Sequence, residues 1–345
     1  MEVTYTCPAC GAAMVYDGAS GKLHCQYCDL YISVYDYEQQ HGNSRQSQTQ
    51  SQTQKGNYGK TITYHCKSCG AELVADEHTS ATMCAFCGNP TLVQDRLDGE
   101  FEPDSIIPFK FDKNAAKDLV KTWMSKGILT PSALKKDSTI DNIMGVYVPF
   151  WLYSYYCTDN MVANATRSRT SSDSKYIYHY TDHFSVARLT NAEFIRIPAD
   201  ASQRMPDDIM DKLEPFEYCQ MIPFSMPYLS GYMSEKYNYT ASQLQDRTQI
   251  RAKKYIEEMT RETILGYSTV TVVSSNVNCQ KRSEEYSLLP VWILNYRYRN
   301  RNHQLFINGQ TGKIVADRPV STVKSVIAGV VTFAVVFAIS MFIGV

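Results

Sequence analysis

The sequence predicts an α+β protein with two small cysteine-rich β modules at its N-terminus, a mixed β-rich core domain and a C-terminal transmembrane helix. Three observations lead to this expectation. Eight of the 11 cysteines stand in Cys-x-x-Cys pairs before residue 88, the middle of the chain mixes strand-like and helix-like patterns, and the last 20 residues carry no charge. Paired cysteines favour small β modules, and a long uncharged run favours a membrane helix.

The composition limits the classes of protein. The 345 residues are 44% hydrophobic, which is enough for more than one domain. The net charge of −1 gives no global basic field that would attract nucleic acid or an anionic membrane. The first residues lack a basic stretch followed by an apolar one, so we expect no secretory signal and a reducing, cytoplasmic compartment. In a reducing compartment, paired cysteines are more often metal ligands than disulfide partners.

The cysteine pairs form two quartets with the same spacing. The pattern Cys-x2-Cys-x14-Cys-x2-Cys occurs twice, offset by 59 residues. Two Cys-x-x-Cys turns joined by a short β excursion place four thiolates around one tetrahedral ion, and zinc suits such a set. We therefore predict two structural Zn²⁺ ions in rubredoxin-like β knuckles, with no open position for catalytic water. The predicted ligands are Cys7, Cys10, Cys25, Cys28, Cys66, Cys69, Cys84 and Cys87.

The residue after the second cysteine of each pair suits a tight turn. It is Gly11, Gly70 or Gly88 in three pairs and Asp29 in the fourth, and both residue types tolerate a positive φ. Redox Cys-x-x-Cys motifs come singly on a βαβ unit, which is absent here. Iron held as in rubredoxin uses the same four thiolates, but the short spacer and the compartment favour zinc.

The patterns divide the chain into five parts, and the core has its own expected elements. The parts are zinc ribbon 1 at 1–38, a Gln/Ser/Thr-rich linker at 39–59, zinc ribbon 2 at 60–100, an α+β core at 101–322 and a transmembrane helix at 323–345. In the core we expect strands at 105–111, 145–156, 175–188, 267–273, 286–299, 304–307 and 313–316. Helices are expected at 113–126, capped by Asp112, at 205–213 and at 241–263, and a turn at 308–312.

Apolar-Pro-aromatic triplets recur in the core. The stretch 107–109 is followed by 148–152, and 222–224 is followed by 289–293 in the same order. This order indicates either two related αβ units or a chance recurrence in a sheet protein rich in Tyr and Pro. Both interpretations stay open on the sequence alone.

The last 20 residues, 326–345, would form about 30 Å of helix, the thickness of a hydrocarbon core. Lys313, Arg318 and Lys324 precede this run, and no charged residue follows it. The positive-inside rule then keeps the preceding domains in the cytoplasm. The expected localisation is the cell membrane, with a single pass and cytoplasmic N-terminal domains.

The chain resembles a known family in several motifs. The quartets are similar to transcription factor IIB-type zinc ribbons. The layout of ribbons, the stretches 107–109, 145–151, 289–292 and 308–313, and a C-terminal apolar helix resembles a bacterial family of membrane-anchored zinc-ribbon proteins of uncharacterised function. The resemblance implies this architecture without a reaction or substrate. Such chains are likened to primosomal helicases, but 309–314 lacks the Gly-x4-Gly-Lys-Ser/Thr spacing of a phosphate-binding loop.

Nucleic acid is an unfavoured partner. Residues 1–100 carry eleven acidic and six basic side chains, and each zinc with four thiolates adds about −2. A phosphate-neutralising surface needs clustered Lys and Arg instead. Three arginines alternate along the chain and would share one face of a strand: Arg297, Arg299 and Arg301. This face could bind phosphate or anionic lipid, or it could simply be solvated.

The search for catalytic residues returns none, so an enzyme is not expected. No nucleophile elbow or His-Glu-x-x-His motif occurs. His179 and His183 stand in a strand-like setting, which separates them by about 13 Å, too far for one ion. Cys157, Cys219 and Cys279 are expected to be buried thiols.

The expected function is a membrane-anchored zinc-binding adaptor or scaffold. Its cytoplasmic ribbons and core would recruit a protein partner that the sequence does not identify. The alternative is a nucleic-acid-binding or transcription- or replication-associated zinc-ribbon protein. A third hypothesis is an enzyme with a core site formed by residues distant in sequence.

Overall fold

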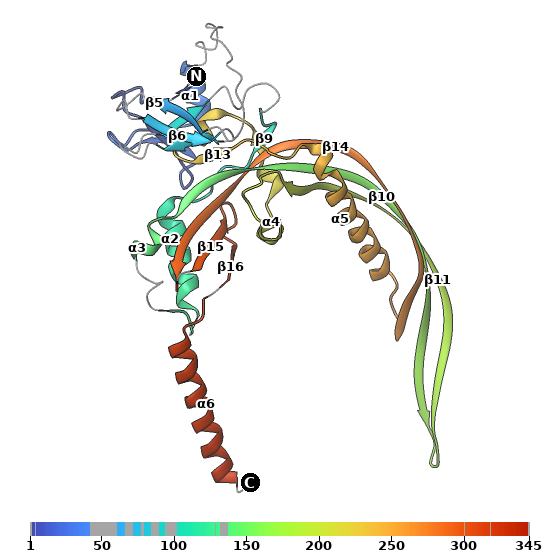
Figure 1. Cartoon of the computed structure of the whole chain (residues 1–345). Coiled ribbons are helices and arrows are strands. Elements are labelled where there is room, and N and C mark those ends of the chain that lie inside the picture. Colours follow the sequence, from blue (N-terminus) through green and yellow to red (C-terminus); the bar gives the residue numbers. More distant parts are fainter. Residues whose placement is uncertain are drawn as a thin grey trace. The chain divides into compact units, whose positions relative to one another are not determined.

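A computed structural model gives the fold of the chain (Figure 1). It describes residues 2–3, 5–41, 61–65, 72–76, 79–83, 90–93, 102–127, 129–131, 137–299, 301–317 and 319–343, with backbone only between 61 and 93. The helices are α1 (Val34–His41), α2 (Lys113–Ser125), α3 (Asp137–Ile140), α4 (Asp207–Leu213), α5 (Ala241–Glu262) and α6 (Thr322–Ile343), with 3-10 turns η5 (Tyr218–Gln220) and η6 (Met226–Leu229).

The strands are β1 (Glu2–Val3), β2 (Met14–Asp17), β3 (Lys22–Cys25), β4 (Tyr31–Ile32), β5 (Thr61–His65), β6 (Glu72–Asp76), β7 (Thr79–Met83), β8 (Pro90–Val93), β9 (Ser105–Ile106), β10 (Met144–Ser172), β11 (Ile177–Asp200), β12 (Ile222–Pro223), β13 (Met233–Glu235), β14 (Thr269–Tyr298), β15 (Arg301–Asn308) and β16 (Ile314–Ala316). Most of them belong to one 11-stranded sheet in the order β1-β8-β7-β13-β10-β14-β15-β16, with β11 beside β10 and with β9 and β12 paired. The pair β10–β13 is parallel, whereas β10–β11 and β14–β15 are antiparallel.

The large mixed sheet corrects the predicted fold class. The molecule is strand-rich, and β10, β11 and β14 are 29, 24 and 30 residues long. The chain divides into two compact units of interleaved segments: unit 1 is Met1–Pro149, Arg204–Lys236 and Leu288–Val345, and unit 2 is Phe150–Gln203 and Tyr237–Ser287. The strands β10 and β14 each contribute residues to both units, and whether the recurring triplets mark two related αβ units stays open.

The core of unit 1 is built on aromatic rings. Phe109 stacks on Tyr232 with ring centroids 4.2 Å apart, and it meets Tyr147 and Trp292 edge-on. Gly145 lets this cluster close, since a Cβ there would lie 2.6 Å from the Tyr232 ring. Such edge-to-face and stacked pairs stabilise beyond their buried area.

The core of unit 2 lies between α5 and the long strands. α5 packs against β11, and its buried residues Ala252 and Ile256 meet Tyr153 and Tyr155 of β10 in one cluster. At the start of α5 the backbone N–H of Thr240 donates to the Gln243 side chain at 2.8 Å, half of a capping box.

The expectation of three buried thiols is wrong. Cys157 and Cys279 form a disulfide that links β10 to its sheet neighbour β14, and Cys219 is exposed in η5. The two cysteines face the same core cluster from adjacent strands, with Cα atoms 4.1 Å apart, so their sulfurs meet.

The predicted helices agree best with the structure. α2 and α5 occupy the expected ranges, and the Asp112 carboxylate caps α2 by accepting from the Ala115 N–H at 2.8 Å. The predicted strand at 105–111 shrinks to β9, whereas the strands at 267–273 and 286–299 join into β14. The residues between these two ranges are polar because this part of β14 is exposed, and a polar run does not show the alternation that predicts a strand.

The tandem repeat of two like modules is also corrected. β2, β3 and β4 around the first quartet form a three-stranded sheet, whereas β5 and β6 form a two-stranded sheet. The hairpin β7–β8 joins the large sheet instead, where β8 pairs with β1 and β7 pairs with β13. The cysteine spacing repeats, and the register of one hairpin repeats with it, since Leu23↔Ile32 in β3–β4 corresponds to Thr82↔Thr91 in β7–β8. Among the described residues the pairing of β2 with β3 has no counterpart, so the two modules are not alike as a whole.

The C-terminal prediction is wrong as well. Among the described residues no helix is both long and apolar enough to cross a membrane. This finding overturns the transmembrane helix at 323–345, and with it the single-pass membrane localisation with cytoplasmic N-terminal domains.

The basic stretch near the C-terminus does not form one strand face. β14 ends at Tyr298 and β15 begins at Arg301, and these two residues are opposite each other in the hairpin. Arg299 stands in the turn with φ +50° and donates to the Thr322 hydroxyl at 2.6 Å. Arg297 and Arg301 therefore flank a hairpin turn, and Arg299 lies within it.

Candidate metal centre

Two equivalent turns hold the first cysteine quartet. In each turn the amide of the fourth residue after the first cysteine donates to that cysteine's carbonyl, Gly11 to Cys7 and Asp29 to Cys25, both at 2.9 Å. The amide of the cysteine itself donates to the carbonyl five positions later, at 2.7 and 2.9 Å. Gly11 and Asp29 have φ of +74° and +56°, which confirms the positive φ expected for both.

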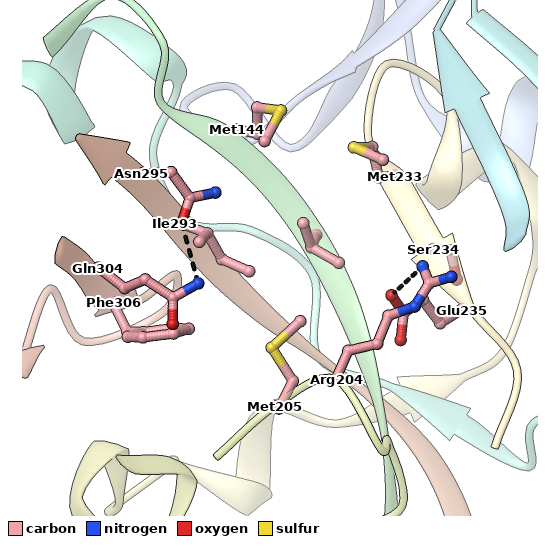
Figure 2. Close-up of a pocket in the computed structure, with 11 residues that line it drawn as sticks. Met144, Arg204, Met205, Met233, Ser234, Glu235, Ile293, Asn295, Gln304 and Phe306 are labelled. Carbon is pink, nitrogen blue, oxygen red and sulfur yellow. Dashed lines mark hydrogen bonds and ion pairs between the residues drawn. The ribbon is translucent and has the colours of Figure 1, made fainter. Parts of the chain in front are cut away.

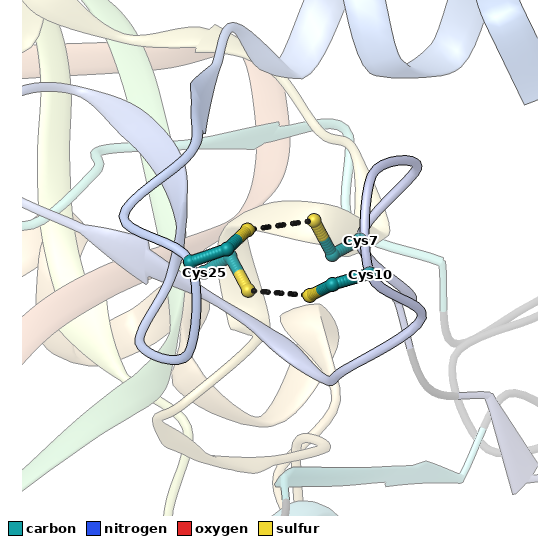
Figure 3. Close-up of side chains that lie close together, drawn as sticks. Cys7, Cys10 and Cys25 are labelled. Carbon is teal, nitrogen blue, oxygen red and sulfur yellow. Dashed lines mark hydrogen bonds between the residues drawn. The ribbon is translucent and has the colours of Figure 1, made fainter.

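The turns bring four sulfur atoms together (Figure 3). The Sγ of Cys7 lies 3.6 Å from that of Cys28, and the Sγ of Cys10 lies 3.5 Å from that of Cys25. All four lie within 4.8 Å of one another. A tetrahedron with metal–sulfur bonds of about 2.3 Å has edges of about 3.8 Å. The quartet therefore fits one metal ion, and four sulfurs would fill its coordination.

The local environment favours the metal-binding form of at least one thiol. Cys7 and Cys25 are buried, whereas Cys10 and Cys28 face solvent. The backbone N–H groups of Cys28 and Tyr27 donate toward the Cys25 sulfur and lower the pKa of this thiol to about 6. The thiolate is the form that binds a metal.

Residues 5–41, which hold the first quartet and are called the metal-binding module below, are part of unit 1. The amide of Tyr16 donates to the Ser230 carbonyl at 2.8 Å, and the Ser230 hydroxyl donates to the Met14 carbonyl at 2.6 Å. Burial raises the pKa of the Tyr16 hydroxyl. Gly231, with φ +90°, allows the close approach, since a Cβ there would lie 3.0 Å from the Val15 Cβ. The first quartet is thus fixed to the rest of unit 1.

The remaining predicted ligands cannot be placed in the same way. Cys66, Cys69, Cys84 and Cys87 lie outside the described residues, as do Gly70 and Gly88.

Two other features that the sequence singled out have known places. His179 and His183 are on β11, as expected for a strand, and the Thr170 hydroxyl contacts His179 Nδ1 at 3.2 Å. The stretch 309–312 is the predicted turn, with the Asn308 carboxamide accepting from the amides of Gln310 and Thr311.

Sequence reasoning missed a second candidate site. A cavity of about 250 Å³ lies on one face of the sheet in unit 1 (Figure 2). Its lining comes from β10, β13, β14 and β15 and from the segment after β11. The alternation of side chains along a strand predicts which residues of that strand share a face. It does not predict which strands are neighbours in the sheet, and the cavity depends on that order.

The fold and the cysteine quartet define a strand-rich protein with one four-cysteine group that could hold a metal ion. No family model matches the chain, and no solved structure matches it. The chain is 35% identical over 324 residues to the uncharacterized protein YdjG of Bacillus subtilis (strain 168), covering 94% of this chain and 92% of YdjG. It therefore belongs to the family of YdjG. This match does not test the resemblance to transcription factor IIB-type zinc ribbons, which stays a prediction.

Proposed function

We propose that the chain is a zinc-binding adaptor that presents its metal-binding module to a protein partner. Zinc fits the first quartet because four thiolates in a tetrahedron suit this ion, and no redox role calls for iron. A second zinc at Cys66, Cys69, Cys84 and Cys87 is proposed on their identical spacing. Both ions would be structural.

Exposed aromatic side chains on the metal-binding module are the observation that carries the adaptor role. Tyr27, Tyr31 and Tyr35 are 83%, 47% and 70% exposed, and Tyr27 lies inside a metal-binding turn. Tyrosine is enriched at the energetic centres of protein interfaces, because it gives a large contact area and a hydroxyl at low entropic cost. A rigid, metal-held turn presents such a ring with little ordering cost on binding.

The quartet gives no support to an enzyme at this site. A catalytic zinc keeps one position for water or substrate, whereas the four sulfurs here fill a tetrahedron. The acidic balance of residues 1–100 likewise disfavours phosphate binding. With catalysis and phosphate binding both disfavoured, we infer that the module binds a protein.

The adaptor proposal is tested by crosslinking in intact cells. The zinc-loaded full chain is compared with a variant carrying Tyr27→Ala and Tyr35→Ala and with the control Tyr176→Ala, whose ring is 64% exposed in unit 2. We expect one specific crosslinked protein that is lost in the double variant and kept in the control. Equal crosslinking of all three chains, or no specific partner, would refute the proposal.

A salt titration separates the adaptor from a nucleic-acid-binding protein. The full chain is titrated with single- and double-stranded DNA and RNA at several salt concentrations. We expect no binding even at low salt. Binding that weakens steeply as salt rises would show phosphate contacts and would replace the adaptor proposal with nucleic-acid binding.

A further inference from the structure

The cavity in unit 1 is built on alternate residues of four neighbouring strands. The strands are β13, β10, β14 and β15 in sheet order, and each contributes a pair of residues separated by one position. β13 also contributes Ser234 between the two residues of its pair, where its pairing with β7 shifts register. These pairs share a face because side chains alternate along a strand. They are Met233 and Glu235, Met144 and Val146, Ile293 and Asn295, and Gln304 and Phe306. Arg204 and Met205 line the cavity from outside these strands.

Most of the lining is apolar and adaptable. The apolar part of the lining consists of Val146, Ile293 and Phe306 together with the three methionines Met144, Met205 and Met233. Methionine side chains are flexible and polarisable, so they adapt to apolar groups of different shape. The cavity therefore offers an apolar body to a ligand.

Two polar pairs lie on opposite sides of this apolar region (Figure 2). On one side the Arg204 guanidinium contacts the Glu235 carboxylate at 3.0 Å, with side chains 44% and 9% exposed. On the other side the Gln304 side-chain amide donates to Asn295 at 3.0 Å. Glu235 and Asn295 stand two strands apart, on β13 and β14, which is roughly 10 Å.

We propose that this cavity binds a small zwitterion, a free α-amino acid with an apolar side chain. Its carboxylate would lie on Arg204, its ammonium on Glu235 and its side chain among the methionines. The side chains favour a zwitterion because Arg204 and Glu235 offer one positive and one negative group side by side, which match the carboxylate and the ammonium of a single ligand.

The size of the cavity sets the length of the side chain. At about 250 Å³ it lies just below the roughly 300–1,000 Å³ typical of sites for drug-sized molecules. The roughly 10 Å between the two polar pairs admits a zwitterionic head and a side chain of a few carbons. L-Leucine and L-methionine are therefore the probes of choice, and glycine is too short to reach the apolar part of the lining.

Calorimetric titration of the purified full chain tests the proposal. L-Leucine is compared with 4-methylpentanoate, which lacks the ammonium, with isoamylamine, which lacks the carboxylate, and with glycine. We expect saturable binding of L-leucine and at least about tenfold weaker binding of each analogue, because each lost charged hydrogen bond costs that much or more. A 4-methylpentanoate affinity equal to that of L-leucine, or no saturable binding of L-leucine or L-methionine below about 10 mM, would overturn the proposal.

A matched pair of variants assigns the binding to this cavity. Glu235→Gln is expected to weaken L-leucine binding at least about tenfold. Glu285→Gln alters a similar half-buried pair in unit 2, where Arg196 Nε lies 3.1 Å from Glu285, and should leave the affinity within about twofold. Equal effects of the two substitutions would place the ligand elsewhere and overturn the assignment.

A measurement on the unaltered chain covers the case in which Glu235→Gln does not fold. Methyl-labelled methionine gives separate NMR signals, and those of Met144, Met205 and Met233 are assigned by Met→Leu substitutions. L-Leucine is expected to shift these signals and to leave those of Met161 and Met210, which are buried away from the cavity, unchanged. Unchanged signals for all three cavity methionines would overturn the proposal.

Discussion

At the residue scale, Cys25 provides a direct test of the metal centre. It is buried, and its carbonyl accepts from the Asp29 amide in the second turn. We expect Cys25→Ser to release about one equivalent of zinc per chain, because hydroxyl oxygen does not replace a thiolate in a four-sulfur site. Elemental mass spectrometry of the purified chain measures this loss.

The matched control for Cys25 is Cys219. It is an exposed single cysteine in η5, and its substitution by serine should leave the zinc content unchanged. If Cys25→Ser and Cys219→Ser retained the same amount of zinc, the quartet would not be the binding site.

Gly231 fixes the contact between the metal-binding module and the rest of unit 1. Its φ of +90° and the 3.0 Å from its ideal Cβ to Val15 both exclude a side chain. We expect Gly231→Ala to lower the free energy of unfolding by more than about 1 kcal/mol. The control is Gly329→Ala in α6, where no atom lies near and alanine favours a helix. Urea unfolding curves compare them, and a destabilisation by Gly329→Ala as large as that by Gly231→Ala would contradict the account.

At the element scale, the disulfide between β10 and β14 should stabilise unit 2. It joins cysteines 122 positions apart, and cross-links over long loops typically contribute about 2–4 kcal/mol. We expect the double variant Cys157→Ala with Cys279→Ala to lose stability in this range, and Cys219→Ala to lose almost none. Urea denaturation under oxidising conditions measures both, and equal midpoints for the two variants and the parent chain would argue against the cross-link.

The elements differ in how well the sequence predicts them. The helix α2 is predictable because a capping aspartate and an apolar periodicity over 113–125 act locally. The full length of β14 is not, because its exposed middle is polar and polar runs are typical of loops. The disulfide depends on the pairing of β10 with β14, which is tertiary information.

At the scale of the whole molecule, the cysteine turns were predictable and their surroundings were not. Residues 7–28 carry the quartet within one short segment, so spacing alone predicts its geometry. The contact of Tyr16 with Ser230 joins positions more than two hundred residues apart, and the cavity draws on four strands. The transmembrane prediction used hydropathy alone, whereas none of the described helices is both long and apolar enough to cross a membrane.

Because the metal-binding module is fixed to unit 1, metal removal should act beyond the cysteine turns. We expect a chelator to lower the hydrogen-exchange protection of β2 and β3 and of the segment around Ser230, whose carbonyl accepts from Tyr16. The protection of α5 in unit 2 should stay unchanged. Mass spectrometry of exchanged peptides tests this, and a uniform loss over both units would show that the metal does not act through unit 1.

X-ray absorption at the zinc edge tests the central claim most directly. The purified full chain should show zinc surrounded by four sulfur atoms at about 2.3 Å, the bond length usual for zinc and thiolate, since the four sulfurs of the first quartet lie within 4.8 Å of one another. A first shell that contains nitrogen or oxygen, or a chain without tightly bound zinc, would contradict a closed four-thiolate zinc centre and the adaptor role built on it.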